Sequence, residues 1–188
     1  MSTMNEINVT TDFDNVILVD ENDKELGTMP KMEAHEKGLL HRAFSVFVFN
    51  SSGELLLHKR ASDKYHCGGM WTNTCCSHPR QGEEVKAAAH RRLQEEMGFN
   101  CTLVPAFEFT YKSELDNHLL EHEYDHVFLG EFDSAPSPNQ GEVEDWQFMR
   151  IDEIRNLLET SPQIFTPWFK IVFERVLNYR SESPNLNL

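Results

Sequence analysis

Apolar residues alternate with polar ones along much of the chain, and this short period predicts strands. Strands are expected at 15–19, 43–49, 54–58, 106–112, 119–132 and near 146–151. Ser51, Ser52 and Gly53 separate two of these runs, 43–49 and 54–58, which favours a hairpin with a glycine-containing turn. From Arg60 to Pro79 the pattern is irregular and rich in glycine and polar residues, as is typical of a substrate-binding loop.

The clearest helix is predicted at 83–97, where Val85, Ala89, Leu93 and Met97 recur every four residues and Gly98 provides a stop. Shorter helices are predicted from Pro30 to Gly38, at 152–158 and at 167–177, the last with Thr166 and Pro167 in the N-cap and first-turn positions. Strands on both sides of one central helix predict an α/β fold of the α+β kind, with a mixed β-sheet sandwiched between helices. We expect one domain spanning 1–188, with a core at about 15–178 and polar termini.

Charge and composition narrow the function. The net charge of −14 argues against a nucleic-acid partner, although a local group of cations could still bind a small phosphorylated ligand. No run reaches the roughly 20 apolar residues of a membrane span, and Met1 to Asp14 is polar and acidic, unlike a signal peptide. The four cysteines do not form a secreted disulfide pattern. We therefore expect a cytoplasmic protein with reduced thiols and no membrane partner.

The central helix lies in the motif Ser77-x5-Glu83-x7-Arg91-Arg92-Leu93-Gln94-Glu95-Glu96-Met97-Gly98-Phe99. This motif resembles the Nudix box, which implies the Nudix fold. Three positions differ: Ser77 replaces a glycine, Arg92 a metal-binding glutamate, and Phe99 an aliphatic residue. The Arg92 change favours direct binding of phosphate oxygens over hydrolysis. Considered alone, the pairs Arg91/Glu95 and Arg92/Glu96 would also suit a plain solvated helix face.

Other segments are similar to the type I isopentenyl-diphosphate isomerases of the Nudix superfamily. They appear in that family's order and cover the chain from about Lys31 to Trp168: Leu40-His41-Arg42-Ala43-Phe44-Ser45, Trp71, Asn73-Thr74-Cys75-Cys76-Ser77-His78-Pro79, Tyr111, Glu121-His122-Glu123 and Thr166-Pro167-Trp168-Phe169. Separated motifs that agree are more specific than any one of them. The resemblance implies an enzyme of isoprenoid biosynthesis that interconverts isopentenyl and dimethylallyl diphosphate through a carbocation.

The resemblance also implies two metal sites. One divalent ion, manganese or zinc, would be held by His35, His41, His78, Glu121 and Glu123. Magnesium would join Glu96 to the substrate diphosphate, with most of its other ligands from water and phosphate. Alternation along a strand places Glu121 and Glu123 on one face and His122 on the other.

The remaining expected roles are catalytic and substrate-binding. In an extended segment Cys76 and His78 share a face that Cys75 does not, and the resemblance selects Cys76 as the reacting thiol. It implies that Glu123, backed by Tyr111, protonates the double bond while Cys76 removes another proton. It also implies two substrate-binding groups: a diphosphate group of Lys31, Arg60, Lys64 and Arg92, and the tryptophans Trp168 and Trp71, which would shield the carbocation.

Two other function classes compete with the isomerase. A Nudix diphosphate hydrolase would release phosphate and would need neither Cys76 nor Glu123. A binding module with a structural zinc would have paired ligands such as Cys-x2-Cys, which the chain lacks. The expected partner is a small diphosphate, and the protein is expected to be a monomer. No role is predicted for a further group of residues: His58, His66, His90, His118, His126 and Cys67.

Overall fold

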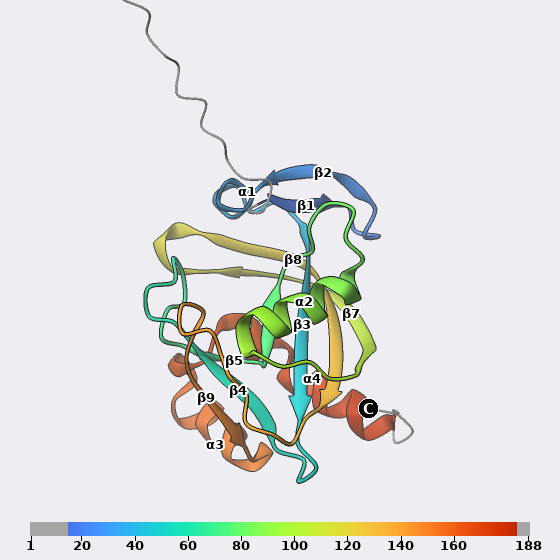
Figure 1. Ribbon diagram of the computed structural model, residues 1–188. Coiled ribbons are helices and arrows are strands. Elements are labelled where there is room, and N and C mark those ends of the chain that lie inside the picture. Colours follow the sequence, from blue (N-terminus) through green and yellow to red (C-terminus); the bar gives the residue numbers. More distant parts are fainter. Residues whose placement is uncertain (1–14, 184–188) are drawn as a thin grey trace, which may run out of the picture.

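The computed structural model describes residues 15–183, and within that range it forms one nine-stranded sheet with helices on both faces (Figure 1). The strands are β1 Asn15–Val19, β2 Glu25–Pro30, β3 His41–Phe49, β4 Leu55–Arg60, β5 Trp71–Thr72, β6 Cys75–Ser77, β7 Leu103–Glu114, β8 Leu120–Glu131 and β9 Val143–Met149. The helices are α1 Lys31–Lys37, α2 Val85–Met97, α3 Ile151–Thr160 and α4 Pro167–Glu182. The expectation about Met1 to Asp14 lies outside the described residues.

Strand β3 is the centre of the sheet and contacts β1, β4, β6 and β8. It runs parallel to β8, from His41 opposite Glu123 to Phe49 opposite Glu131. Strand β7 then pairs with β8 in the antiparallel sense, and β9 pairs with β4 in the same sense. Parallel and antiparallel neighbours in one sheet confirm the predicted mixed sheet.

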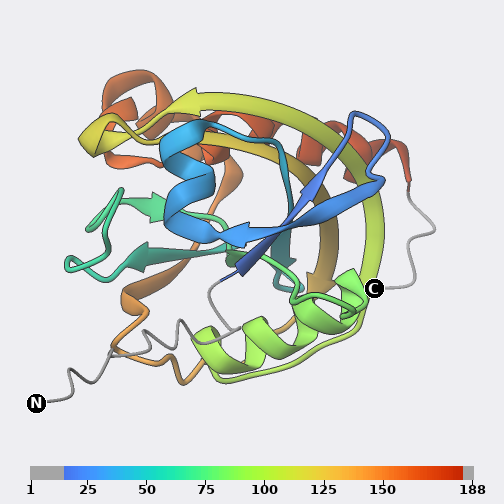
Figure 2. The same ribbon diagram turned by 90° about the horizontal axis from the view of Figure 1, so that it is seen from above.

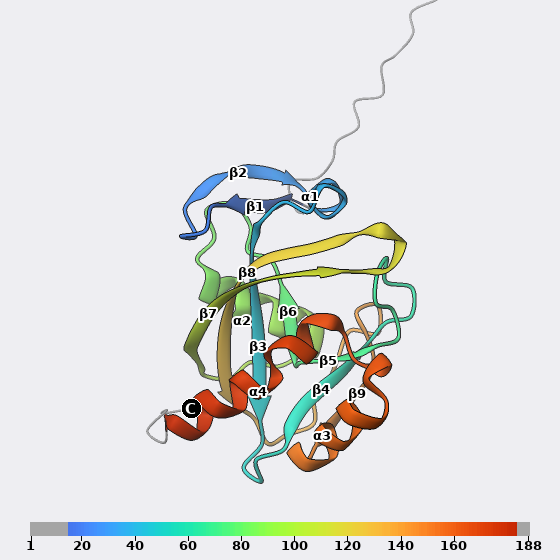
Figure 3. The same ribbon diagram turned by 180° about the vertical axis from the view of Figure 1, so that it is seen from behind.

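Residues of β3 alternate between two hydrophobic clusters, one on each face of the sheet. Phe44, Val46 and Val48 pack in the cluster that contains the buried side of α2. Phe47 and Phe49 pack in the cluster that contains α4 and part of α3. Figures 2 and 3 show α2 and α4 on opposite sides of the sheet. The sandwich predicted from the sequence is therefore present.

Helix α2 begins two residues later than predicted, because Glu84 is its N-cap and accepts a hydrogen bond from the Ala87 amide at 2.8 Å. It ends as predicted at Gly98, where φ is 72°. A Cβ atom at this position would lie 2.0 Å from the carbonyl oxygen of Ser137. Only glycine fits both the backbone conformation and the contact.

Several predictions of local structure were wrong. The expected hairpin is limited to one pair, Phe49 with Leu55, because β3 pairs mainly with β6 and β8 while β4 turns away to β9. The segment read as an irregular loop contains β5 and β6, and β2 was not predicted at all. Thr166 occupies the N-cap position of α4, but its hydroxyl donates to Thr72 Oγ1 instead of capping the helix.

Candidate active site

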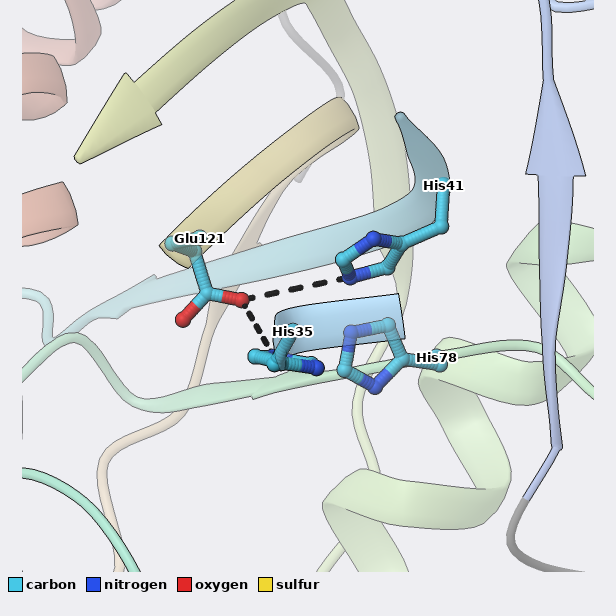
Figure 4. A group of neighbouring side chains, drawn as sticks. All are labelled: His35, His41, His78 and Glu121. Carbon is cyan, nitrogen blue, oxygen red and sulfur yellow. Dashed lines mark hydrogen bonds and ion pairs between the residues drawn. The ribbon is translucent and has the colours of Figure 1, made fainter. Parts of the chain in front are cut away.

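Side chains from four separate segments meet at one end of the β3/β8 pair (Figure 4). His41 begins β3, His35 lies on α1, and His78 follows β6. Together with Glu121 of β8, each offers one nitrogen or oxygen atom, and these atoms lie within 4.8 Å of one another. Parallel pairing of β3 with β8 brings His41 beside the two carboxylates of β8, since His41 is in register with Glu123.

Backbone carbonyl groups orient two of the imidazoles. The Nδ1–H of His35 donates to the Lys31 carbonyl at 2.7 Å, and that of His41 donates to the Leu39 carbonyl at 2.8 Å. Each Nε2 lone pair therefore faces the centre of the group. His35 Nε2 lies 2.9 Å from Glu121 Oε1, so in the neutral state a lone pair faces a carboxylate oxygen.

The Nε2 atom of His41 is buried and has no hydrogen-bond partner among residues 15–183. It lies 3.9 Å from Glu121 Oε1 and 3.7 Å from Glu123 Oε1. A buried acceptor without a partner and converging lone pairs are costly unless a cation lies between them. The donor set of imidazole and carboxylate groups thus fits a divalent metal ion.

Glu123 connects this group to a buried tyrosine. Tyr111 donates to its Oε2 at 2.6 Å, and His78 Nε2 lies 2.9 Å from its Oε1. Burial alone would raise the pKa of Glu123, but the interactions with His41 and the hydrogen bond from Tyr111 outweigh it, so the pKa lies below the ordinary value. The carboxylate of Glu123 is therefore ionised in the substrate-free protein.

The adjacent thiols face opposite sides of β6, as the alternation predicted. Cys75 is fully buried in the cluster under α2, and its Sγ donates to Glu96 Oε2 at 3.6 Å. Cys76 lines a cavity together with His78. Burial is the main reason why the pKa of the Cys76 thiol lies well above its ordinary value, so the sulfur carries a proton.

Two cavities that share lining residues adjoin this thiol, and we call the smaller one the inner cavity and the larger one the outer cavity. The inner one, of about 40 Å³, is lined by Lys31, Arg60, His66, Cys76, Ser77, His78, Tyr111, Glu121, Glu123 and Trp168. The outer one, of about 760 Å³, shares five of these residues with the inner one: Lys31, Arg60, Cys76, Ser77 and His78. Trp71 lines neither of the two cavities, although it packs against the hydrophobic cluster that contains Trp168.

The predicted phosphate-binding cations meet at the outer cavity. Its lining includes Lys31, Arg60, Lys64 and Arg92. Lys64 and Arg92 both pair with Glu142, which the sequence analysis did not identify as a site residue. Burial opposes the charge of Arg92, but its carboxylate partners outweigh that effect and raise the pKa of the guanidinium.

Glu96 is 5% exposed and lines the same outer cavity. One of its oxygens accepts from Arg92 and the other accepts from the Cys75 thiol. Burial dominates over the attraction of Arg92 and raises the pKa of this carboxyl group above its ordinary value. The predicted magnesium ligand therefore lies beside the predicted phosphate-binding cations.

Two further residues of the site were missed. His66 lines the inner cavity, but it lies in a segment without periodicity, so no sequence signal marked it. Asp125 is 1% exposed and accepts a hydrogen bond from Ser45 at 2.8 Å. Continuing the alternation of Glu121 and Glu123 by one step along β8 would have found it.

The chain is similar to known proteins over most of its length. Residues 39–169 match the NUDIX domain family. The isopentenyl-diphosphate Delta-isomerase of Pectobacterium atrosepticum is 54% identical, over 87% of this chain and 92% of that protein. Isopentenyl-diphosphate Delta-isomerase 1 of Aromatoleum aromaticum is 51% identical, over 90% of this chain and 96% of that protein.

Solved structures agree on the fold. A Deinococcus radiodurans crystal structure superposes with a TM-score of 0.71 at 16% identity, covering 86% of this chain and 98% of that chain. A MutT protein from Methanosarcina mazei gives a TM-score of 0.61 at 18% identity, covering 77% of this chain and 95% of that chain. These likenesses show the Nudix fold, in agreement with the matched domain, and the two relatives show that the chain belongs to the isopentenyl-diphosphate Delta-isomerase family.

Proposed function

We propose that the protein interconverts isopentenyl diphosphate and dimethylallyl diphosphate and so serves isoprenoid biosynthesis. The observation that carries this proposal is the pair formed by Cys76 and Glu123, which line the same inner cavity. Moving a double bond requires one proton to be added and another to be removed, and a thiol and a carboxylate beside one small space supply both groups. The cations around the outer cavity bind the diphosphate, which does not react.

The proton transfers balance between these two groups. Toward dimethylallyl diphosphate, protonated Glu123 gives its proton to the terminal methylene carbon, which leaves a cation at the branched carbon. Ionised Cys76 then takes a proton from C2, and the electrons of that C–H bond form the new double bond. In the opposite direction Cys76 protonates C2 and Glu123 accepts the methyl proton.

The pKa directions support one of these two states for the substrate-free protein. The pKa of Cys76 is raised and that of Glu123 is lowered, so the proton lies on sulfur. This is the starting state for turnover of dimethylallyl diphosphate. Turnover of isopentenyl diphosphate needs the proton on Glu123. The phenol of Tyr111 is positioned to donate a hydrogen bond to Glu123 whether that carboxyl group is ionised or protonated.

Trp168 is proposed to shield the cation. Its ring lines the inner cavity, and its indole Nε1 donates to Thr72 Oγ1 at 2.9 Å, which fixes the ring orientation. A tryptophan face beside a desolvated cation contributes on the order of 2 kcal/mol. Trp71 lies outside both cavities, so we assign it no part in this role.

The proposed metal site consists of the group around His41: His35, His41, His78, Glu121 and Glu123. A divalent ion bound there, manganese or zinc, supplies positive charge that holds the carboxylates and favours the ionised state of Glu123. Magnesium is proposed to accompany the substrate diphosphate at Glu96, because a single carboxylate beside phosphate oxygens is a common environment for that ion.

We also propose that the chain works as a single-domain monomer in the cytoplasm. Its four cysteines are free thiols, which suits a reducing compartment. The proposed partner is a small diphosphate, without a nucleic acid or a membrane. Within residues 15–183, the helices are all too short or too polar to cross a bilayer.

The test is to incubate the protein with isopentenyl diphosphate and divalent metal in heavy water and follow deuterium by NMR. Deuterium should enter the new methyl group of dimethylallyl diphosphate. Cys76→Ala and Glu123→Gln should each lower the rate by at least ~2 orders of magnitude, because each removes a general acid–base group. Cys101→Ala is the matched control, since this thiol lines neither cavity. Release of inorganic phosphate or pyrophosphate as the main product would favour a Nudix diphosphate hydrolase instead.

A further inference from the structure

One aromatic residue of the inner cavity has no part in the chemistry proposed above. His66 lies in the connection between β4 and β5, is 5% exposed, and lines the inner cavity but not the outer one. Its Nδ1 atom is buried and has no hydrogen-bond partner among the described residues. A buried polar ring at a substrate cavity calls for an explanation, because an unpaired polar atom costs free energy.

Neighbouring rings hold His66 in place. Trp168 lies edge-to-face with it, at 5.8 Å between ring centroids and 85° between planes. Tyr65 packs against it at 4.4 Å and 90°, and His35 stacks on it at 5.9 Å and 27°. The Arg60 guanidinium also donates to the backbone carbonyl of His66 at 3.2 Å. The ring is therefore part of a rigid wall whose position a substrate cannot easily change.

The two cavities define the direction in which a substrate lies. Of the cations that would bind a diphosphate, Lys64 and Arg92 line only the outer cavity, whereas Lys31 and Arg60 line both cavities. The residues that line only the inner cavity are His66, Tyr111, Glu121, Glu123 and Trp168. A diphosphate in the outer cavity thus directs its hydrocarbon end toward the wall formed by His66 and Trp168. The inner cavity is only about 40 Å³, so the volume of one ring matters for what it accommodates.

We propose that His66 closes the hydrocarbon end of the cavity and sets the largest alkyl group that the site accepts on the branched carbon. The inference rests on the isomerase function proposed above. One methylene group in such a pocket changes kcat/KM by about 10–200-fold.

The experiment compares isopentenyl diphosphate with its homologue that carries an ethyl group in place of the methyl group. The measured quantity is the ratio of kcat/KM for the two substrates. The natural protein should prefer isopentenyl diphosphate, and both His66→Ala and His66→Asn should shift the ratio toward the homologue by at least ~10-fold. His66→Phe retains an aromatic ring and should retain the natural preference.

His90→Ala is the matched control. This histidine lies on α2, contacts Asn100, and lines neither cavity, so the ratio should not change. His66→Ala and His66→Asn are both tested in case one of them fails to fold, and circular dichroism verifies the fold of each variant. An unchanged ratio in a folded, active truncation would overturn the role of His66 while leaving the isomerase intact. Absence of isomerisation by the natural protein would overturn the proposed function itself.

Discussion

Thr72 forms a buried hydrogen-bond centre that connects β5 to the start of α4. Its Oγ1 accepts hydrogen bonds from Trp168 Nε1 and from the Thr166 hydroxyl, each at 2.9 Å, and donates to Asn73 Oδ1 at 2.9 Å. This uses the full capacity of one hydroxyl group, which has one donor and two acceptor positions. Thr72 is 0% exposed, so water cannot replace any of these bonds.

Thr72→Val keeps the shape of the side chain but removes the hydroxyl group. The donors of Trp168 and Thr166 and the acceptor of Asn73 then lose a partner in a buried environment. Each unsatisfied group costs roughly 1–3 kcal/mol, and partial relaxation reduces the sum to about 3 kcal/mol. For a chain of this size, that loss corresponds to a fall of about 6–12 °C in Tm.

The assay is urea and thermal unfolding followed by circular dichroism, with Thr102→Val as the matched control. Thr102 is exposed, so the same chemical change there should alter the free energy of unfolding by no more than about 0.5 kcal/mol. If Thr72→Val proved as stable as the control, the hydrogen-bond centre would contribute nothing, and Trp168 would have to be positioned by packing alone.

Metal binding, acidity and backbone conformation give three more predictions. Manganese or zinc at about 100 times its Kd should raise the unfolding free energy of the stripped protein by about 2.7 kcal/mol, and His41→Ala should remove this gain in a thermal-shift assay. Burial lowers the pKa of His58 to about 4. Between pH 6.5 and 4 the unfolded state therefore binds more protons than the folded state, and the free energy of unfolding falls as pH falls. His58→Asn should reduce this fall by about 2–3 kcal/mol, measured by urea unfolding at a series of pH values. Gly98→Ala should cost at least ~2 kcal/mol of unfolding free energy through its clash with the Ser137 carbonyl, whereas Gly82→Ala, with nothing within 4 Å, should cost only about 1 kcal/mol.

Periodicity was a good guide where local pattern and tertiary environment agree. The four-residue spacing on α2 identified Leu93 and Met97, which are fully buried against the sheet. Alternation on β8 placed Glu121 and Glu123 on the buried face and left His122 on the other, where it contacts the Gly38 carbonyl. These elements are long, so a shift of one residue in the pattern would turn a whole row of apolar side chains toward solvent.

The missed features depend on contacts between distant parts of the chain. Strand β6 is only three residues long, and it forms because Cys75, Cys76 and Ser77 pair with β3. The expected hairpin failed for the same reason, since β6 pairs with Phe44, Ser45 and Val46 on the edge of β3 that a longer hairpin partner would need. Glu142 and His66 entered the site through loops, whose paths no local pattern determines.

The two adjacent thiols of β6 lie between Glu96 on one side of the strand and the inner cavity on the other. Cys75 contacts Glu96 on the side of α2, and Cys76, one residue later, faces the inner cavity. The residue that contacts Glu96 is therefore the direct neighbour of the proposed reacting thiol. This geometry explains a consequence of Arg92 at the position of a metal-binding glutamate: its guanidinium binds Glu96 directly and holds it against β6. On the proposed function, helix α2 would therefore help to position the thiol strand and to bind the phosphate, and would leave the diphosphate bond intact.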